Sequence, residues 1–235
     1  MPEFFGLDIG SHSIKAVQVR RDDRGGVRLT HFSTYSTPSD AYGSQAEKHK
    51  KKLAEAVKNT MEEAGIKSSQ VVASLPESKI FTRVIEMPKM SEKELKSSLE
   101  YEAERYIPFP VESAVFDSEI VSKGENSKKM QVLLVAAPES LVTRYLDILE
   151  GAGLEILALE PETVSLVRAL VGRGEKAAVP TLLVSIGSST TDLVITENGK
   201  IGFTRSVATG GKALGRALAR ALSFEEEQAE SYKRS

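Results

Sequence analysis

The feature that most constrains this chain of 235 residues is an internal duplication. Residues 7–17 align without gaps on residues 184–194, and each copy reads as a strand, a tight turn and a second strand. Both turns, at residues 10–13 and 187–190, have the form Gly-Ser-x-Ser/Thr. Glycine lets the backbone close tightly, and successive free N–H groups in such a turn form a nest that binds anions. Either copy alone is an ordinary hairpin, but two facing copies can hold a polyphosphate from both sides.

Polar groups near these turns supply the rest of a phosphate site. Hydroxyl groups that add hydrogen-bond donors belong to Ser11, Ser13, Ser188 and Thr190. Asp8 ends the first strand beside the nest, where a carboxylate can hold Mg²⁺ through water. Gly210 and Gly211 open a predicted helix, whose N-terminal dipole favours anions, although a helix start alone is a weak signal.

Around the first copy of the hairpin, the sequence predicts a β-β-β-α-β unit. Strands are expected over residues 4–10, 13–20, 27–37 and 70–75. Between the last two strands the apolar period becomes helical over residues 45–64, and Gly65 is placed to end that helix.

A smaller α+β module is predicted over residues 78–160, inserted into the larger domain. Ser91 and Glu94 have the spacing of a capping box and predict a helix over residues 92–106, which Pro108 ends. The other elements expected in this module are strands over residues 80–87, 114–122, 130–137 and 154–159 and a helix over residues 139–152.

The second copy of the hairpin follows a helix that runs to Leu170. Strands are expected over residues 181–186, 191–196 and 201–207. Asn198-Gly199 is a strong hairpin turn between the last two strands. A helix over residues 210–222 and a final polar helix from Phe224 complete the chain.

The composition limits the classes of function. Lys and Arg total 31 against 33 Asp and Glu, a formal net charge of −2, which argues against a general nucleic-acid or anionic-membrane binder. The absence of cysteine excludes disulfides, thiol catalysis and Cys-ligated zinc, and the three histidines lack zinc-site spacing. The apolar runs are strand-length and the N-terminus lacks the basic region of a signal peptide, so we expect a cytoplasmic protein.

Four segments carry a resemblance to a known family: residues 6–15, 87–95, 102–110 and 186–192. On these segments, and on Gly210-Gly211, the chain resembles the PilM family of type IV pilus assembly proteins. That family belongs to the actin-like ATPase superfamily and is related to the FtsA family of cell-division proteins. Its most specific feature here is Tyr-Ile-Pro-Phe-Pro at residues 106–110, which sugar kinases and chaperones lack. The resemblance covers essentially the whole chain.

The resemblance implies an α/β architecture, the actin-like (ribonuclease H-like) ATPase fold with a small α+β inserted subdomain. It implies that subdomain 1A comprises residues 1–77 and 161–178, subdomain 1C residues 78–160, and the start of subdomain 2A residues 179–235. Relatives continue into a subdomain 2B, so we expect the chain to be C-terminally incomplete.

The resemblance also implies that ATP and Mg²⁺ bind in the cleft between the two halves. The nucleotide contacts expected by match to the family are Gly10, Ser11, Ser13, Lys15, Gly187, Ser188, Thr190, Gly210 and Gly211. Asp8 is the expected metal-binding and catalytic carboxylate. Glu160, near the start of the helix that links the halves, has the position of a water-orienting group, although a plain carboxylate at a helix start explains it equally well.

Two departures from the family pattern weaken the expected activity. Where the second hairpin would begin with an acid like Asp8, this chain has Ser185, which can bind a metal's water but adds no charge. Asp192 lies one strand further on and is expected to point elsewhere. Because the cleft would also be incomplete, we expect the chain to bind ATP weakly or not at all and to be at most a weak ATPase.

A protein partner is implied as well. In the family, the cytoplasmic N-terminal peptide of a PilN-like membrane protein lies in a groove between subdomains 1A and 1C. The residues expected to bind it are Ile80, Val84, Ile107 and Phe109. The chain would then be a cytoplasmic scaffold, peripheral to the inner membrane through its partner and in contact with other pilus motor components.

Two other functions stay open from the sequence. Sugar kinases share the two hairpins, so a small-molecule kinase is one alternative, although no obvious substrate-activating base is present. An FtsA-like filament tethered to the membrane is the other.

Overall fold

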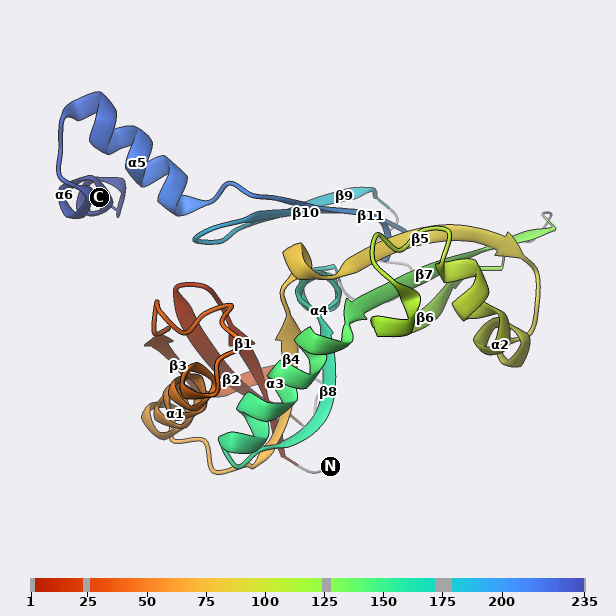
Figure 1. Ribbon diagram of the computed structural model, residues 1–235, viewed down its shortest axis with the longest axis horizontal. Helices are drawn as coiled ribbons and strands as arrows, with labels where there is room; N and C mark the ends of the chain where they lie inside the picture. The colour runs from red at the N-terminus through yellow and green to blue at the C-terminus, as the bar shows by residue number, and fades with distance from the viewer. Residues whose placement is uncertain (1–2, 23–25, 124–127, 172–178, 235) are drawn as a thin grey trace.

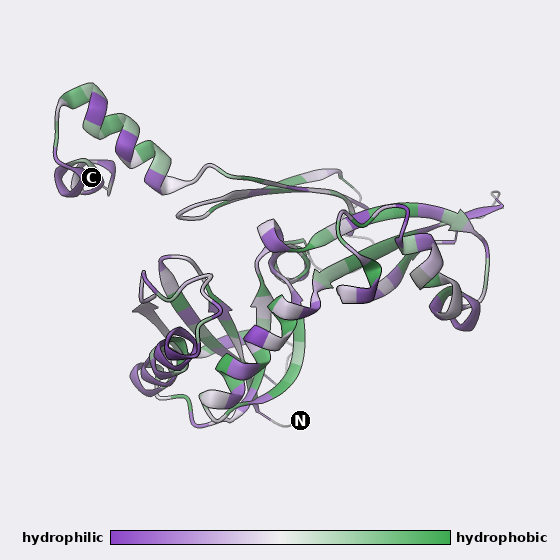
Figure 2. Cartoon of the chain, in the orientation of Figure 1, coloured by the Kyte–Doolittle hydropathy of each residue, from purple (hydrophilic) through white to green (hydrophobic). Residues whose placement is uncertain are grey.

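The computed structural model describes residues 3–22, 26–123, 128–171 and 179–234. Three sheets organise this part of the chain (Figure 1). In Figure 2, hydrophobic residues run along the strands of the first two sheets, while α1 and α6 show hydrophilic surfaces.

The first sheet contains both the N-terminal hairpin and the strands that support it. Its strands are β1 (Phe4–Ile9), β2 (Ser13–Arg21), β3 (Val27–Ser36), β4 (Gln70–Leu75) and β8 (Glu155–Pro161), in the order β3-β2-β1-β4-β8. The first three strands are antiparallel, whereas β4 and β8 run parallel to β1. Helices α1 (Glu47–Ala64) and α3 (Glu139–Gly151) cover one face (Figure 1). Gly65 ends α1 with a φ of 67°, as predicted.

The inserted module is an antiparallel sheet with one helix. Its strands are β5 (Phe81–Pro88), β6 (Ala114–Ser122) and β7 (Lys129–Pro138), in the order β5-β7-β6, and its helix is α2 (Glu92–Ala103). The capping box is confirmed: the N–H of Glu94 donates to Ser91 Oγ, and its carboxylate accepts from the N–H of Ser91 at 2.7 Å. The helix ends three residues before the predicted Tyr106, because the N–H groups of Tyr106 and Ile107 close a final turn on the carbonyl of Ala103.

The predicted limit of this module at residue 160 is wrong. Strand β8 pairs in parallel with β4 of the first sheet, and α3 packs on α1. Tyr145 and Ile148 of α3 are buried in the core that contains Phe5. The periodicity of α3 and β8 predicts a helix and a strand, but the choice of sheet depends on contacts between segments far apart in the chain.

The third sheet contains the second hairpin. It is formed by β9 (Thr181–Ile186), β10 (Thr191–Glu197) and β11 (Lys200–Val207), and the order is β11-β10-β9. Asn198 and Gly199 both have positive φ, as the predicted turn requires. Helix α4 (Glu162–Leu170) packs on one face through Val167. Helices α5 (Gly211–Leu222) and α6 (Glu226–Arg234) follow and lie at the end of the molecule (Figure 1).

No helix in the described ranges is both long enough and apolar enough to cross a bilayer.

Candidate functional site

The two duplicated turns have the same backbone geometry. The N–H of Gly10 donates to the carbonyl of Ser13 at 3.1 Å, and the N–H of Gly187 donates to the carbonyl of Thr190 at 2.8 Å. In the described part of the chain, the backbone N–H groups that follow these glycines donate no hydrogen bond; they belong to Ser11, His12, Ser188 and Ser189. Each turn therefore has open donors of the kind that form an anion nest.

The hairpins face each other, as the duplication predicts. The hydroxyl oxygens of Ser11 and Ser189 lie 3.1 Å apart, although 178 positions separate them in the chain. A bound phosphate must lie beside this hydrogen bond or replace it. The sequence analysis did not include Ser189, because its position within the turn carries no signal beyond the hydroxyl itself.

In the first hairpin, the carboxylate of Asp8 is held on both sides. Lys15 Nζ donates to its Oδ2 at 2.8 Å, and Ser74 Oγ of β4 donates to its Oδ1 at 3.1 Å. Lys15 stands directly opposite Asp8 in the β1–β2 register. The side chain of Asp8 is 33% exposed, so a ligand in the cleft can reach it.

In the second hairpin, the acid stands on the opposite strand. Asp192 of β10 is directly across from Ser185 of β9, in the arrangement that pairs Lys15 with Asp8. The prediction that Asp192 points elsewhere is wrong. Asp192 is only 6% exposed, its Oδ1 is buried without a hydrogen-bond partner, and its charge helps to raise the pKa of Glu162.

Glu162, the first residue of α4, is a partly buried carboxyl group near the acids of both hairpins. Burial raises its pKa to about 8, and the charges of Asp8 and Asp192 add to this effect. The predicted residue, Glu160, lies two positions earlier, where Arg168 donates to both of its carboxylate oxygens at 3.0 and 2.7 Å. The sequence Glu-Pro-Glu places two carboxylates at the start of this helix. The structure is needed to show which one is held by Arg168 and which one lies near the hairpins.

Glu77 adds a fourth carboxyl group from the turn before β5. It is 5% exposed and accepts a hydrogen bond from Thr163 Oγ1 at 2.7 Å. Burial is the main cause that raises its pKa, and the charge of Asp192 contributes. We call Asp8, Glu77, Glu162 and Asp192 the acidic cluster. Within the described residues, no three of the metal-binding side chains are placed to hold one ion directly.

Gly210 and Gly211 fix the second hairpin to α5. A Cβ atom on Gly210 would lie 2.6 Å from the carbonyl oxygen of Gly187, so only glycine fits this close approach. The N–H groups of Gly211 and Lys212 donate to the carbonyls of Gly187 and Ser188 at 2.8 and 3.0 Å. These first donors of α5 therefore position the hairpin and are not free to bind a phosphate.

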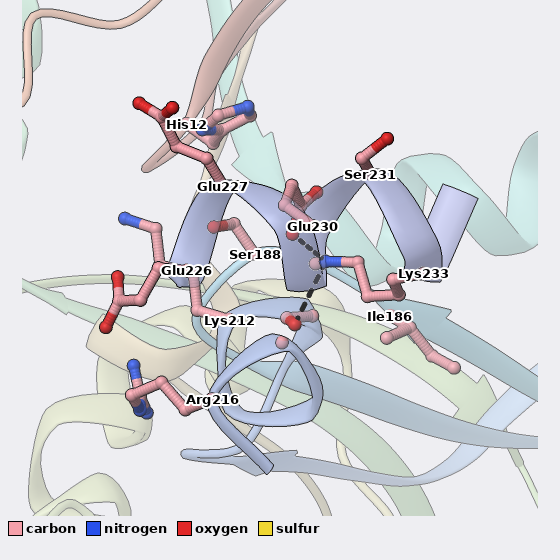
Figure 3. Close-up of a pocket in the computed structure, with 13 residues that line it drawn as sticks. His12, Ile186, Ser188, Lys212, Arg216, Glu226, Glu227, Glu230, Ser231 and Lys233 are labelled. Carbon is pink, nitrogen blue, oxygen red and sulfur yellow. Dashed lines mark hydrogen bonds and ion pairs between the residues drawn. The ribbon is translucent and has the colours of Figure 1, made fainter. Parts of the chain in front are cut away.

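A cavity of about 850 Å³ opens beside the second hairpin. Its charged and polar lining includes His12, Lys212, Arg216, Glu226, Glu230 and Lys233 (Figure 3). Lys233 donates to Glu230 and to the carbonyl of Gly211, so α6 is tied to the start of α5. The sequence analysis did not identify these residues, because α6 reads as an ordinary polar helix.

The four predicted partner-binding residues do not form one surface. Ile107 is 8% exposed in the core of the inserted module, and Phe109 packs half-buried against the same core. Ile80 and Val84 line a different cavity, between β5 and β11. Ile107, which was expected to bind the partner, instead packs in the core, because the turn after α2 folds this side chain inward.

A family model described as type IV pilus assembly protein PilM matches residues 6–235. The chain belongs to the PilM family of type IV pilus assembly proteins. A solved structure described as a PilM–PilN type IV pilus biogenesis complex superimposes with a TM-score of 0.84 at 29% identity, over 99% of this chain and 69% of that chain.

Two more distant relatives place the PilM family among related folds. Ethanolamine utilization protein EutJ of Salmonella typhimurium is 36% identical over 92 residues, which are 38% of this chain and 30% of EutJ. A Bacteroides thetaiotaomicron protein described as having an actin-like ATPase fold superimposes with a TM-score of 0.51 at 12% identity, over 95% of this chain and 78% of that chain. The fold is the actin-like ATPase fold with an inserted α+β module.

Proposed function

We propose that this chain is a nucleotide-binding scaffold of type IV pilus assembly that acts at the cytoplasmic side of the inner membrane. The observation that carries the nucleotide part is the pair of facing hairpins with open N–H donors, joined at Ser11 and Ser189. Membership of the PilM family supports the pilus role.

ATP would place its phosphates between the two turns. The free N–H groups of both turns point to an anionic ligand, and Lys15 adds a positive charge beside Asp8. The cavity of about 850 Å³ beside the second hairpin has room for a nucleoside.

The acidic cluster fits a magnesium ion held largely through water. Asp192 has a buried carboxylate oxygen without a partner, and Asp8 presents a part-exposed carboxylate from the other hairpin. Bound Mg²⁺ would neutralise phosphate charge in this cleft. Glu162 is placed to orient a water molecule, and its raised pKa keeps it mainly protonated below pH 8, which favours at most weak hydrolysis.

Isothermal titration of the 235-residue chain with Mg-ATP tests this part of the proposal. We expect weak but saturable binding that weakens about tenfold or more in Asp8→Asn, because the ion would lose one of its carboxylates. Asp117→Asn, at an exposed position of β6, is the matched control. No binding by the natural sequence at millimolar Mg-ATP, or equal weakening in the control, would contradict it.

We propose that the partner is a PilN-like N-terminal peptide, because the structural match is to a PilM–PilN complex. The junction of the inserted module with α4 contains a groove of about 340 Å³. Val121 of β6, Leu133 of β7 and Val164 of α4 line it. Because β6 is an edge strand, an extended peptide can pair with it and insert apolar side chains.

Fluorescence anisotropy with a labelled PilN-tail peptide tests this groove. Val121→Asp should abolish binding, since it puts a charge into the apolar lining. Val115→Asp is the matched control, since Val115 lies on the same strand and is already 48% exposed. Unchanged binding in Val121→Asp would show that the peptide binds at another site and would leave the nucleotide proposal intact.

A further inference from the structure

A groove of about 590 Å³ separates β5 of the inserted module from β11 of the third sheet. Both strands are edges of their sheets, so each has backbone N–H and C=O groups that its own sheet leaves unpaired. The strands touch where Thr204 Oγ1 donates to the carbonyl of Thr82 at 3.0 Å. Figure 1 shows β5 and β11 side by side above α4.

The lining of this groove is positively charged. Arg83 of β5 and Arg205 of β11 are exposed, and neither forms an ion pair within the described part of the chain. Arg83 lies over the ring of Tyr106, 5.9 Å from its centroid, which holds the guanidinium in place. Glu77, the single carboxyl group among the lining residues, is buried against Thr163 and does not neutralise the arginines.

The groove also has an apolar side. Phe203 of β11 is 49% exposed and offers an apolar contact beside Arg205.

We propose that this groove binds an extended acidic segment of a partner protein. Edge strands supply main-chain hydrogen bonds to an extended peptide, and arginine is suited to bind carboxylates in two-point geometry. Two arginines beside a phenylalanine match alternating acidic and apolar side chains. A nucleic acid fits less well, since its phosphates need a larger array of cations than two arginines on a chain of net charge −2.

This interface is separate from the groove beside β6. The two grooves share no lining residue: this one lies between β5 and β11, whereas the β6 groove is lined by β6, β7, α4 and residues 198–201 of the third sheet. The inference goes beyond the proposed function and does not depend on the nucleotide. Ile80 and Val84, which the sequence analysis expects to bind a PilN-like peptide, line this groove and not the β6 groove.

Two labelled eight-residue peptides test the inference on the complete chain, one alternating Asp with Val and the other Lys with Val. In fluorescence anisotropy, we expect the acidic peptide to bind at least about tenfold more tightly than the basic one. Backbone amide NMR shifts should concentrate at Thr82 and in residues 202–206. Charge reversal at both arginines, Arg83→Glu with Arg205→Glu, should remove or invert the preference.

Controls keep the result decisive. Arg28→Glu, on the exposed surface of β3, should keep the preference, and Arg205→Lys should keep most of it. Circular dichroism shows whether the double variant is folded, and Arg205→Glu alone provides the test if it is not. Absence of acidic-peptide binding at millimolar concentration, equal binding of both peptides, or tighter binding of a single-stranded oligonucleotide would overturn the inference.

Discussion

The two duplicated hairpins have the same turn hydrogen bond and differ in where they place charge. In the first hairpin, Asp8 stands opposite Lys15 and is paired with it at 2.8 Å. In the second, Ser185 stands opposite Asp192, which is 6% exposed and has an unpartnered oxygen. The first hairpin is electrostatically satisfied by its own residues, whereas the second leaves a buried acid that needs a proton or a cation.

Ser185 at the position of Asp8 therefore does not mean that the second hairpin lacks an acid. The duplication preserves the turn but moves the acid of the second hairpin across to the neighbouring strand. Because side chains directly opposite in an antiparallel pair share one face of the sheet, the acid still reaches the cleft from Asp192. Both hairpins therefore place an acid near Glu162, whose pKa is raised to about 8 mainly by burial and further by the charges of Asp8 and Asp192.

The largest expected effect comes from removing the carboxyl group that faces both hairpins. Between pH 4.5, its ordinary pKa, and pH 8, the folded chain keeps the proton on Glu162 and the unfolded chain releases it. The free energy of unfolding should therefore fall as pH rises through this window. Glu162→Gln should remove on the order of 2–4 kcal/mol of that decline.

Urea unfolding of both proteins at pH 5 and pH 8 measures this effect. Glu150→Gln, at an exposed position of α3, is the control and should follow the natural sequence. The same decline with and without Glu162 would show that neither hairpin acts on it.

The second prediction compares the two turn glycines. A Cβ on Gly10 would lie 2.8 Å from the carbonyl oxygen of Ser13, and a Cβ on Gly187 would lie 3.1 Å from that of Thr190. Gly10→Ala should destabilise the chain by about 1–3 kcal/mol, and Gly187→Ala by less, since its contact is less severe. Gly202→Ala, where the nearest atom is at 3.6 Å, is the control in thermal unfolding. The reverse order of the two turn variants would refute the tighter packing of the first hairpin.

The third prediction compares how the charges of Asp192 and Asp8 affect stability. Asp192→Asn should stabilise the chain by about 1 kcal/mol at pH 7, because it removes a buried charge that no cation among the described residues pairs with. Asp8→Asn should cost about 0.2–1 kcal/mol, because it breaks a part-exposed ion pair with Lys15. Denaturant titration at pH 7 measures both, and effects of the same sign would remove the contrast between the hairpins.

The smallest effect concerns the contact between the hairpins. A double-mutant cycle on Ser11→Ala and Ser189→Ala should give a coupling energy of about 0.5 kcal/mol, typical of an exposed hydrogen bond. Saturating Mg-ATP should abolish the coupling if phosphate replaces this bond. A coupling that persists with ligand would place the phosphate beside the two hydroxyls.

Local features of the fold could be predicted from the sequence. Gly65 ends α1, Ser91 and Glu94 form the capping box, and Asn198-Gly199 makes the turn, because each depends on residues within one turn of the chain. The duplication predicted that the two hairpins face each other, because two facing anion-binding turns can hold a polyphosphate from both sides.

Features that depend on distant pairing could not be predicted. The sheet that β8 joins and the orientation of Asp192 follow from strand partners that no local pattern specifies. The choice between Glu160 and Glu162 needed the position of Arg168 and the burial at the cleft. Ile107 was expected to bind the partner because the sequence shows where a helix ends and not in which direction the following turn folds.

The central claim is that Asp192 supplies the acid of the second hairpin. Moving this acid to the other strand of the hairpin tests the claim most directly. The measurement is the Mg²⁺-dependent gain in ATP affinity, by isothermal titration with and without the metal, for the natural chain, Asp192→Ser, and Asp192→Ser combined with Ser185→Asp. We expect Asp192→Ser to lose most of the gain, about tenfold, and the double variant to recover it, because the acid returns to the same face of the hairpin from the other strand. A full Mg²⁺-dependent gain in Asp192→Ser would contradict the claim that Asp192 supplies the acid of the second hairpin.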